Sequence, residues 1–389
     1  MSVTEDVAPE IACNVSLQGG HANYTNGSCG QDEFWTVSAG DLVLGILFTV
    51  ITLTAIIGNV FVIVAVFKYR RLRTMTNLFI LNLAFADELV GSLIMTTTLT
   101  YHFAGKWYFG TVYCHFWLAI DIVACTSSIN HLCCIAIDRY VAINYPFTYD
   151  AKMSAKKLAC ISTIVWIISG LIGFIPIFFG WYKRPGFEQP PMDCLVNFNT
   201  AFSISSSLIS FYIPLIIMCF VYWRIYKTAS YHHKQIYKTT VGSSPMCNEK
   251  LTTGNSSTRS PLNRRKQKQA STIKEHGKAA KTLGVIMGCF IACWLPFFVM
   301  NIVSPLCGDC IPELISVIFT WLGYANSAVN PFLYGCLNKE FKNAFKDLLH
   351  VGKICGQQLR SQPRKMRIET TLDFTTCNSS QNNATVSKL

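Results

Sequence analysis

Isolated acidic side chains lie inside long apolar stretches of this sequence. Asp121 occurs in LAIDIVACTSS, and Asp87 occurs in LNLAFADELVG, where Glu88 follows it. A carboxylate in such surroundings is costly to desolvate, so it needs a cation or several hydrogen-bond donors close to it. No Lys or Arg occupies the corresponding halves of the apolar stretches, so Asp121 predicts a site for a protonated amine. The alternative is a carboxylate that is hydrogen-bonded only to neighbouring hydroxyls.

Three hydroxyl groups in SISSSLISFYIP could form the other side of such a site. Ser206 and Ser207 precede Ser210 by four and three residues, a spacing that places all three near one face of a helix. Serines in apolar helices also bond back to the preceding turn, which is the alternative. Opposite a carboxylate they suit the polar groups of a ligand ring, as in a phenylethylamine or a catecholamine. Aromatic side chains, which also occur in plain helix cores, could line the gap: Trp294, Phe297, Phe298, Trp321 and Tyr324.

The elements that must position these residues are seven long apolar stretches. The chain is 51% hydrophobic and 14% charged, against about 25% charged in ordinary soluble proteins. Roughly 20 apolar residues cross the hydrocarbon of a bilayer. One such stretch could be a buried helix of a soluble protein, but seven predict an all-α membrane protein, a seven-transmembrane helix bundle. They cover about residues 42–67, 78–101, 114–137, 158–181, 201–223, 280–304 and 312–335.

The basic residues predict how this bundle is oriented. Of the 33 Lys and Arg residues, only Lys106, Lys183 and Arg184 fall in loops on one side, and the others gather on the opposite side. This distribution is the positive-inside pattern, so we expect a plasma-membrane protein with an extracellular N-terminus. It also explains the net charge of +12 without a nucleic-acid partner. Three N-glycosylation sequons in the N-terminal segment agree, at Asn14, Asn23 and Asn26.

The chain divides into one membrane domain and polar flanks. We expect a glycosylated N-terminus over 1–41, a seven-helix domain over 42–350 and a cytosolic tail over 351–389. Within the domain, residues 226–276 form a polar cytosolic loop that we expect to be mostly disordered. The segment LNKEFKNAFKDLLH places Leu337, Phe341, Phe345 and Leu348 on one face, which predicts a short amphipathic helix on the inner leaflet. Cys355 follows it as a candidate palmitoylation site.

Four cysteines are candidates for disulfides at the outer side of the bundle. Cys114 begins the third apolar stretch and Cys194 lies in the loop before the fifth, so a bond between them would tether this loop over the bundle. Cys307 and Cys310 share the last outer loop and could close a small ring. A metal-binding pair is the alternative for these two, but no second ligand pair is visible, so we expect no metal centre.

Beyond these residues, a set of motifs occurs in a fixed order along the chain. They are Gly58-Asn59, LAFAD ending at Asp87, WYFG at Trp107–Gly110, Asp138-Arg139-Tyr140, Trp166, CWLPFF at Cys293–Phe298 and WLGYANSAVNPFLY at Trp321–Tyr334. With them, the chain resembles the biogenic-amine branch of the rhodopsin-like G-protein-coupled receptors from about residue 42 to 350. Within that branch it is most similar to the dopamine, beta-adrenergic and octopamine receptors that stimulate adenylyl cyclase.

The resemblance implies roles for individual residues. The implied ligand contacts are Asp121, Cys125, Ser206, Ser207, Ser210, Trp294, Phe297, Phe298, Asn301, Trp321 and Tyr324. A sodium-binding polar cluster is implied at Asp87, Ser128, Asn326 and Asn330. The implied G-protein switch comprises Asp138, Arg139, Tyr140, Phe147, Tyr222 and Tyr334.

The same resemblance implies partners. They are a small amine, the stimulatory heterotrimeric G protein, arrestin, receptor kinases and membrane lipid, with no cofactor except an allosteric sodium ion. A catecholamine such as dopamine is the favoured ligand, and octopamine, noradrenaline, serotonin, histamine and a trace amine are alternatives. The C-terminal Ser387-Lys388-Leu389 also suits a PDZ domain.

Three departures from the family pattern stand out. Glu88 replaces an apolar residue next to Asp87, and the segment LIMTTTLTYHF lacks the usual proline. Gly277 shifts Glu275 out of register with the acidic residue that usually restrains Arg139. We therefore expect an altered polar cluster, a differently tilted second helix and a weaker restraint on Arg139.

Other classes of protein fit the sequence less well. An opsin needs a lysine in the seventh helix to attach retinal, and residues 311–334 contain none. A transporter or channel would show paired repeats and interrupted helices, which the sequence lacks. An enzyme would need a nucleophile with its base, or a metal constellation, and neither is visible, so no catalytic residue is expected.

Overall fold

The computed structural model of the chain describes residues 39–241 and 261–349, together with 17–18 and 21–22. Within the long ranges it leaves out residues 146–147, 187, 189, 191, 195–197 and 309. From residue 39 onward, side chains are described except at 150, 152, 229, 232–241 and 261–283.

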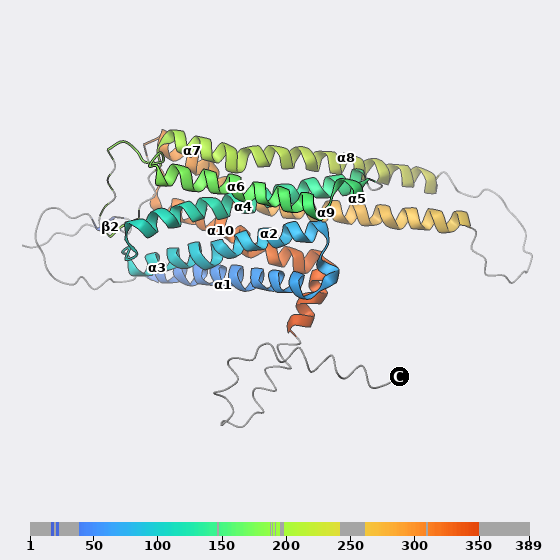
Figure 1. The fold of residues 1–389 in the computed structure, drawn as a ribbon, viewed down its shortest axis with the longest axis horizontal. Coiled ribbons are helices and arrows are strands. Elements are labelled where there is room, and N and C mark those ends of the chain that lie inside the picture. Colours follow the sequence, from blue (N-terminus) through green and yellow to red (C-terminus); the bar gives the residue numbers. More distant parts are fainter. Residues whose placement is uncertain are drawn as a thin grey trace, which may run out of the picture.

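The described residues form long helices that run side by side (Figure 1). The helices are α1 (Ala39–Lys68), α2 (Met75–Leu89), α3 (Thr96–Ala104), α4 (Gly110–Asn144), α5 (Tyr149–Lys152), α6 (Ala155–Phe178), α7 (Thr200–Ser207), α8 (Ile213–Val241), α9 (Pro261–Leu306) and α10 (Glu313–Leu337). A short 3-10 turn, η1, spans Arg70–Leu72, and two π-helical segments, η2 (Val90–Met95) and η3 (Leu208–Tyr212), join α2 to α3 and α7 to α8. The antiparallel pair β1 (Leu17–Gln18) and β2 (His21–Ala22) lies near the N-terminus.

The predicted membrane helices are present, and all but the fourth are longer than the sequence indicated; α6 has the predicted length but begins and ends three residues earlier. Among the described residues, six continuous helical spans are long and apolar enough to cross a bilayer: 39–68, 75–104, 110–144, 155–178, 200–228 and 284–306. The seventh predicted span corresponds to α10, whose 25 residues include the polar Asn326, Ser327 and Asn330. These three side chains are buried against the bundle, so they lower the hydropathy of α10 without facing lipid. The prediction of an all-α seven-helix membrane fold is confirmed.

The outer surface of α1 shows what surrounds the bundle. Large apolar side chains at every third or fourth position are about half exposed, among them Val43, Ile46, Val50, Leu53 and Ile57. The opposite face of the same helix is buried. A continuous apolar stripe of this length is unfavourable in water, so it indicates the face that contacts lipid.

Capping side chains fix where several helices begin. Thr74 accepts a hydrogen bond from the Asn77 backbone N–H (3.4 Å), and Ser154 accepts one from Lys157 N–H (3.4 Å). The Asn199 side chain accepts one from Phe202 N–H at 2.8 Å. Such caps satisfy N–H groups that the first helical turn leaves unpaired. They explain why α2, α6 and α7 begin at these residues.

Helix α4 is the central element of the bundle. In its most apolar window 61% of residues are buried, compared with 28% in α6 and 22% in α9. It packs against α2, α6 and α8, so Asp121 and Arg139 on α4 are both enclosed by other helices. At one end of the bundle, α8 and α9 extend beyond their neighbours (Figure 1).

Two π-helical segments widen the helices that border the cavity described below. η3 ends two residues before Pro214, whose missing N–H and ring disfavour a regular α-helix in the preceding turn. η2 contains no proline, but the hydroxyls of Ser92 and Thr96 donate to the carbonyls of Glu88 and Ser92. Such bonds from side chain to backbone bend helices. The second helix is therefore distorted in its outer half although the usual proline is absent.

The predicted amphipathic helix follows α10 at residues 339–349. Phe341 is buried and packs against Tyr334, with their rings 5.9 Å apart. Arg71 lies 3.4 Å from the carboxylates of both Glu340 and Asp347, which ties this helix to the turn between α1 and α2.

Close packing between α4 and α6 yields a stability prediction. A Cβ atom on Gly173 would lie 2.6 Å from the Ala119 carbonyl oxygen, so Gly173→Ala should destabilise the protein by about 1–3 kcal/mol. Gly170, on the same helix, has open space at its Cβ position, so Gly170→Ala should be neutral or slightly stabilising. The melting temperatures of the two purified variants in detergent measure the difference, and equal values would contradict the packing.

Candidate ligand-binding site

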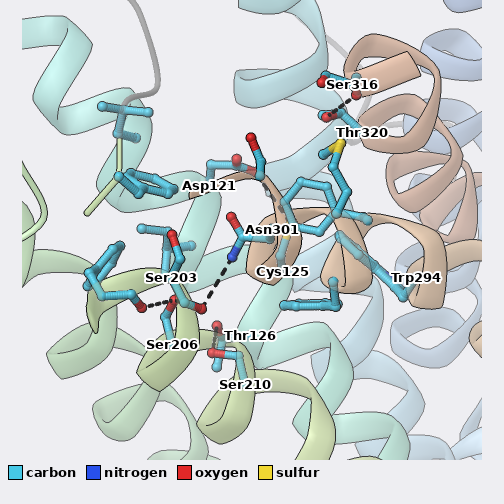
Figure 2. Close-up of a pocket in the computed structure, with 18 of the residues that line it drawn as sticks. Asp121, Cys125, Thr126, Ser203, Ser206, Ser210, Trp294, Asn301, Ser316 and Thr320 are labelled. Carbon is cyan, nitrogen blue, oxygen red and sulfur yellow. Dashed lines mark hydrogen bonds between the residues drawn. The ribbon is translucent and has the colours of Figure 1, made fainter. Parts of the chain in front are cut away.

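A cavity of about 300 Å³ lies between the helices at the end of the bundle away from the α8 and α9 extensions. Its volume is near the lower end of the range for small-molecule sites, about 300–1,000 Å³. Figure 2 shows its labelled walls. Four helices and the outer loop contribute to the lining. It includes Asp121, Cys125 and Thr126 of α4, Ser203 and Ser206 of α7, Ser210 of η3, Trp294, Phe297, Phe298, Asn301 and Ser304 of α9, Thr320 and Tyr324 of α10, and the loop residues Arg184 and Phe198.

Asp121 is half-buried in the wall of this cavity. The Tyr324 hydroxyl donates a hydrogen bond to its Oδ2 (3.0 Å), and the Cys125 thiol donates to its Oδ1 (3.3 Å). The ion pairs found among described residues include none to Asp121. A thiol is a weak donor, so the carboxylate is only partly compensated within the protein. A ligand ammonium would complete its coordination.

The serines of the fifth membrane helix do not all face the cavity. Ser206 and Ser210 line it, as predicted, and Ser203, which the sequence analysis did not select, lines it one turn further out. Ser207 is buried outside the wall, where it accepts a hydrogen bond from Asn301 Nδ2 at 2.9 Å. The Ser206 hydroxyl donates to the Phe202 carbonyl (2.6 Å), and Ser210 accepts from Thr126 (3.0 Å). Ser207 therefore supports Asn301 and is not itself part of the lining.

Aromatic side chains of α9 form a second wall. Phe297 and Phe298 meet edge to face with centroids 5.2 Å apart, and Trp294 lies edge to face with Phe297 at 5.9 Å. Trp321 was expected in the same wall but does not line the cavity; it stacks on Phe48 at 4.0 Å. Its ring is buried between α1 and α10, a contact that helical spacing within one segment could not reveal.

The outer loop between α6 and α7 is held against the bundle by three contacts. The disulfide joins Cys114 to Cys194, as predicted. The Tyr101 hydroxyl donates to Asp193 Oδ1 (2.7 Å), and the backbone N–H of Trp107 donates to the Met192 carbonyl (2.7 Å). The second predicted disulfide, between Cys307 and Cys310, closes the loop between α9 and α10.

Arg184 of the outer loop is the residue that sequence reasoning missed most clearly. Its side chain lines the same cavity as Asp121. The sequence signal was present, because Arg184 is one of the few basic residues on the outer side, but its loop position gave no indication that it reaches the cavity.

Asp87 forms a second polar cluster deeper in the bundle. Its fully buried carboxylate accepts hydrogen bonds from Ser128 (2.9 Å), Ser327 (2.8 Å) and Asn330 Nδ2 (2.8 Å). Asn326 was expected in this set, but its amide Nδ2 has no hydrogen-bond partner among the described residues, and Ser327 takes the role. The half-buried side chain of Glu88 makes no hydrogen bond to Asp87 in the described structure.

The donor set around Asp87 fits a hard cation. Carboxylate and hydroxyl oxygens are the ligands that such ions prefer. The Ser128 and Ser327 hydroxyls each lie within hydrogen-bond distance of the Asp87 carboxylate. Several buried polar atoms have no partner among the described residues, including Asn59 Oδ1 and the Tyr334 hydroxyl. The residues present are therefore compatible with the predicted sodium ion, which would neutralise the Asp87 charge.

At the other end of α4, Arg139 is held by its neighbours. It donates to Asp138 Oδ2 from Nε (3.1 Å) and from a terminal nitrogen (2.8 Å), and it also bonds to Thr76. Asp138 accepts further bonds from Thr76 (2.6 Å) and Tyr149 (2.7 Å). Burial, and next the bond to Asp138, raise the pKa of the Tyr149 hydroxyl, so it remains a donor at neutral pH.

Other predicted switch residues are only partly brought together here. Tyr334 and Arg139 line a second cavity of about 570 Å³ at the α8–α9 end. Among described residues, Tyr140 contacts Tyr145 (centroids 6.2 Å apart) and not the Arg139 network, and Tyr222 is partly buried on α8. Phe147, Asn14, Asn23, Asn26, Cys355 and the Glu275 side chain lie outside the described residues and stay predictions.

The helical fold agrees with the sequence comparisons. Residues 58–334 match the model of the 7 transmembrane receptors of the rhodopsin family. The chain belongs to this family, whose members are receptors and not enzymes.

Individual relatives place it among amine receptors. The chain is 40% identical to Octopamine receptor beta-1R of Drosophila melanogaster over 350 residues, which cover 89% of this chain and 67% of the relative. It is 37% identical to the D(1A) dopamine receptor of Xenopus laevis, covering 81% and 74% of the two chains. It is 36% identical to the Histamine H2 receptor of Rattus norvegicus, covering 84% of each. The predicted resemblance to the biogenic-amine branch is confirmed.

The Asp87 cluster yields a prediction that separates Ser327 from Asn326. If sodium binds there, NaCl should raise the melting temperature of the purified receptor above that in choline chloride of equal ionic strength. Ser327→Ala removes an oxygen next to Asp87, so we expect the variant to bind sodium more weakly and to gain less stability from NaCl. A tenfold weaker site would reduce the stabilisation by about 1.4 kcal/mol. Asn326→Ala should retain it. Equal sodium effects in both variants would contradict the assignment.

Proposed function

We propose that this protein is a cell-surface receptor for a biogenic amine that couples to the stimulatory G protein and raises cyclic AMP. The observation that carries the proposal is Asp121, a half-buried carboxylate in the cavity wall that forms no ion pair among the described residues. The names of the relatives, which are octopamine, dopamine and histamine receptors, support the ligand class.

In the proposed complex, the ligand ammonium pairs with Asp121. The hydrogen bonds from Tyr324 and Cys125 hold the carboxylate in place before binding, which reduces the entropy that binding has to remove. The ligand ring then lies against Phe297 and Phe298, and its hydroxyl groups reach Ser206 and Ser210. Because the site excludes bulk water, the ionic contact is stronger than it would be on the surface.

An aromatic chain connects the proposed ring position to deeper helices. Phe298 stacks on Phe211 with centroids 4.4 Å apart, and Phe211 contacts Phe290 at 5.7 Å. Phe290 precedes Trp294 by one turn of α9, and both Phe290 and Ile129 of α4 are almost completely buried. We infer that ligand contact with Phe298 and Trp294 shifts this packing from one arrangement to another. Two discrete arrangements are expected because packed cores do not deform continuously.

The cytosolic end provides the proposed output. Release of Arg139 from Asp138 and Thr76, with movement of Tyr222 and Tyr334, would enlarge the cavity at the α8–α9 end for the G protein. Phe147 of the loop beside α5 is proposed to insert into it. Arrestin, receptor kinases, a PDZ protein at the C-terminus and lipid at residues 339–349 are further proposed partners, and the plasma membrane is the proposed location.

A catecholamine such as dopamine is the proposed ligand. Ser206 and Ser210 are one helical turn apart in the wall, a spacing that offers two contacts to a ring with adjacent hydroxyls. Octopamine is the second candidate, because the chain is 40% identical to one octopamine receptor and 37% identical to another. Cyclic AMP in transfected cells treated with dopamine, noradrenaline, octopamine, tyramine, serotonin or histamine distinguishes these ligands.

Neutralising Asp121 should abolish the response to whichever amine is most potent. Asp121→Asn keeps the side-chain shape but removes the charge, so we expect a loss of potency of at least about 100-fold. Glu313→Gln, the same chemical change at an exposed acid outside the cavity, should leave potency near the wild-type value. Surface expression of both variants is the control, and an unchanged response in Asp121→Asn would refute the amine site.

The catechol proposal makes a separate prediction about the serines. Ser206→Ala and Ser210→Ala should each lower the potency of dopamine by about fivefold to tenfold, which corresponds to one hydrogen bond. Phenethylamine, which has no ring hydroxyls, should be affected much less. Ser207→Ala should affect the two ligands equally, because Ser207 lies outside the cavity wall. Equal losses for both ligands in all three variants would contradict the catechol assignment.

A further inference from the structure

Trp294 differs from three other tryptophans of the bundle in how its ring is held. The indole N–H groups of Trp107, Trp117 and Trp166 each donate a hydrogen bond to a nearby oxygen atom. The indole nitrogen of Trp294 is buried and has no hydrogen-bond partner among the described residues, although a buried indole N–H usually finds one. The position of Trp294 therefore depends on the atoms that pack around its ring.

Two phenylalanines and one glycine surround this ring. Phe297 and Phe298 of the same helix lie 5.9 and 5.7 Å from it, measured between ring centroids. On α10, a Cβ atom added to the buried Gly323 would lie 2.7 Å from Cζ3 and 2.8 Å from Cε3 of the indole. Carbon atoms in favourable contact are about 3.5–4.0 Å apart. No side chain therefore fits between the backbone of α10 and this ring.

The indole separates Gly323 from the ligand cavity. Trp294 lines the cavity, and so do Thr320 and Tyr324, but Gly323 is not among the described lining residues. Because Gly323 packs against the indole and not against the cavity, the ring lies between the two. A methyl group on Gly323 would press on the ring from behind and move it toward the cavity. The cavity of about 300 Å³ is small for a ligand site, so it has little space to lose.

The backbone of α10 gives no other reason for a glycine at this position. Gly323 lies well inside the helix, where glycine is less favourable than alanine because it loses more freedom on folding. The described glycines with positive φ do not include Gly323, so its conformation is open to any residue. Without the contact to Trp294, replacement by alanine would stabilise the helix. The contact and the helix preference thus predict opposite signs for the same substitution.

We propose that Gly323 is a positioning residue for Trp294. The absence of a Cβ atom lets the indole lie against α10, and this position leaves the cavity the space that the ligand ring needs. Gly323 does not contact the ligand and acts through the tryptophan ring. The inference rests on the proposed amine site at Asp121 and identifies a residue outside the cavity that shapes it.

A cycle of variants without ligand tests the contact itself. The melting temperatures of purified full-length Gly323→Ala, Trp294→Phe and the double variant are compared with the wild type. Gly323→Ala should lower the melting temperature of the wild type. In the Trp294→Phe background it should leave the value unchanged or raise it, because a phenyl ring lacks the outer atoms of the indole and the helix preference of alanine remains. An equal decrease in both backgrounds would overturn the proposal.

The same cycle also covers a single variant that does not fold. If Gly323→Ala yields no folded receptor but the double variant does, the smaller ring rescues the fold and the contact is supported. If neither yields folded receptor, alanine is harmful whatever the ring at position 294, and the proposal is overturned.

Ligand affinity tests whether the contact shapes the cavity. The dissociation constants of dopamine and octopamine come from the concentration dependence of the melting temperature. Gly323→Ala should weaken binding of dopamine by about tenfold, a coupling within the range for residues in contact. In the Trp294→Phe background the same substitution should change affinity by less than about twofold, as for independent sites. A loss of equal size in both backgrounds would show that Gly323 does not act through Trp294.

Gly58→Ala is the matched control. A Cβ atom on Gly58 of α1 would lie 2.8 Å from Cγ of Pro331, a similar overlap with α10 at residues that do not line the ligand cavity in the described structure. Gly58→Ala should lower the melting temperature but leave the dissociation constant of dopamine unchanged. If it weakens dopamine as much as Gly323→Ala does, the loss reflects a general loosening of α10, and the positioning role is overturned.

Failure of this inference can be distinguished from failure of the proposed function. If neither dopamine nor octopamine stabilises the wild type, the proposed ligands are wrong, whereas the melting temperatures without ligand still decide whether Gly323 positions Trp294. If the amines bind but Gly323→Ala has the same effect in both backgrounds, only the inference about Gly323 is overturned.

Discussion

Carboxylates inside a helical bundle have to be compensated there, because the surrounding hydrocarbon and packed side chains stabilise charge poorly. Asp87 receives three hydrogen bonds from hydroxyl and amide groups, and Asp138 is bonded by Arg139, Thr76 and Tyr149. Asp121 has only one strong donor and one thiol. It is the least compensated of the three, and it is the one that lines a cavity of ligand size. This imbalance is the physical basis of the proposed amine binding.

The helices are shaped so that this carboxylate faces a cavity and not another side chain. Gly173 lets α6 approach α4 closely, which supports the helix that carries Asp121. The π-helical segment before Pro214 turns Ser210 toward the same space. The disulfide to Cys194 holds the outer loop beside it. Family membership establishes the bundle, but these local distortions and tethers decide the shape of the site.

Ligand identity depends on the walls and not on the fold, since the same bundle occurs in receptors named for octopamine, dopamine and histamine. In this chain the wall contains a guanidinium from the outer loop in addition to the carboxylate.

The seven membrane helices, their approximate limits and the charged residues within them could all be predicted from the sequence. These follow from composition and local spacing, which one-dimensional patterns contain. The sequence also indicated both disulfides, Asp121 and two of the three serines. Which side chains contact one another depends on how the helices pack in three dimensions. Helical spacing placed Ser207 and Trp321 in the site, but packing directs them to Asn301 and Phe48. Ser327 and Arg184 belong to sites because segments distant in sequence converge there, and no local pattern encodes that convergence.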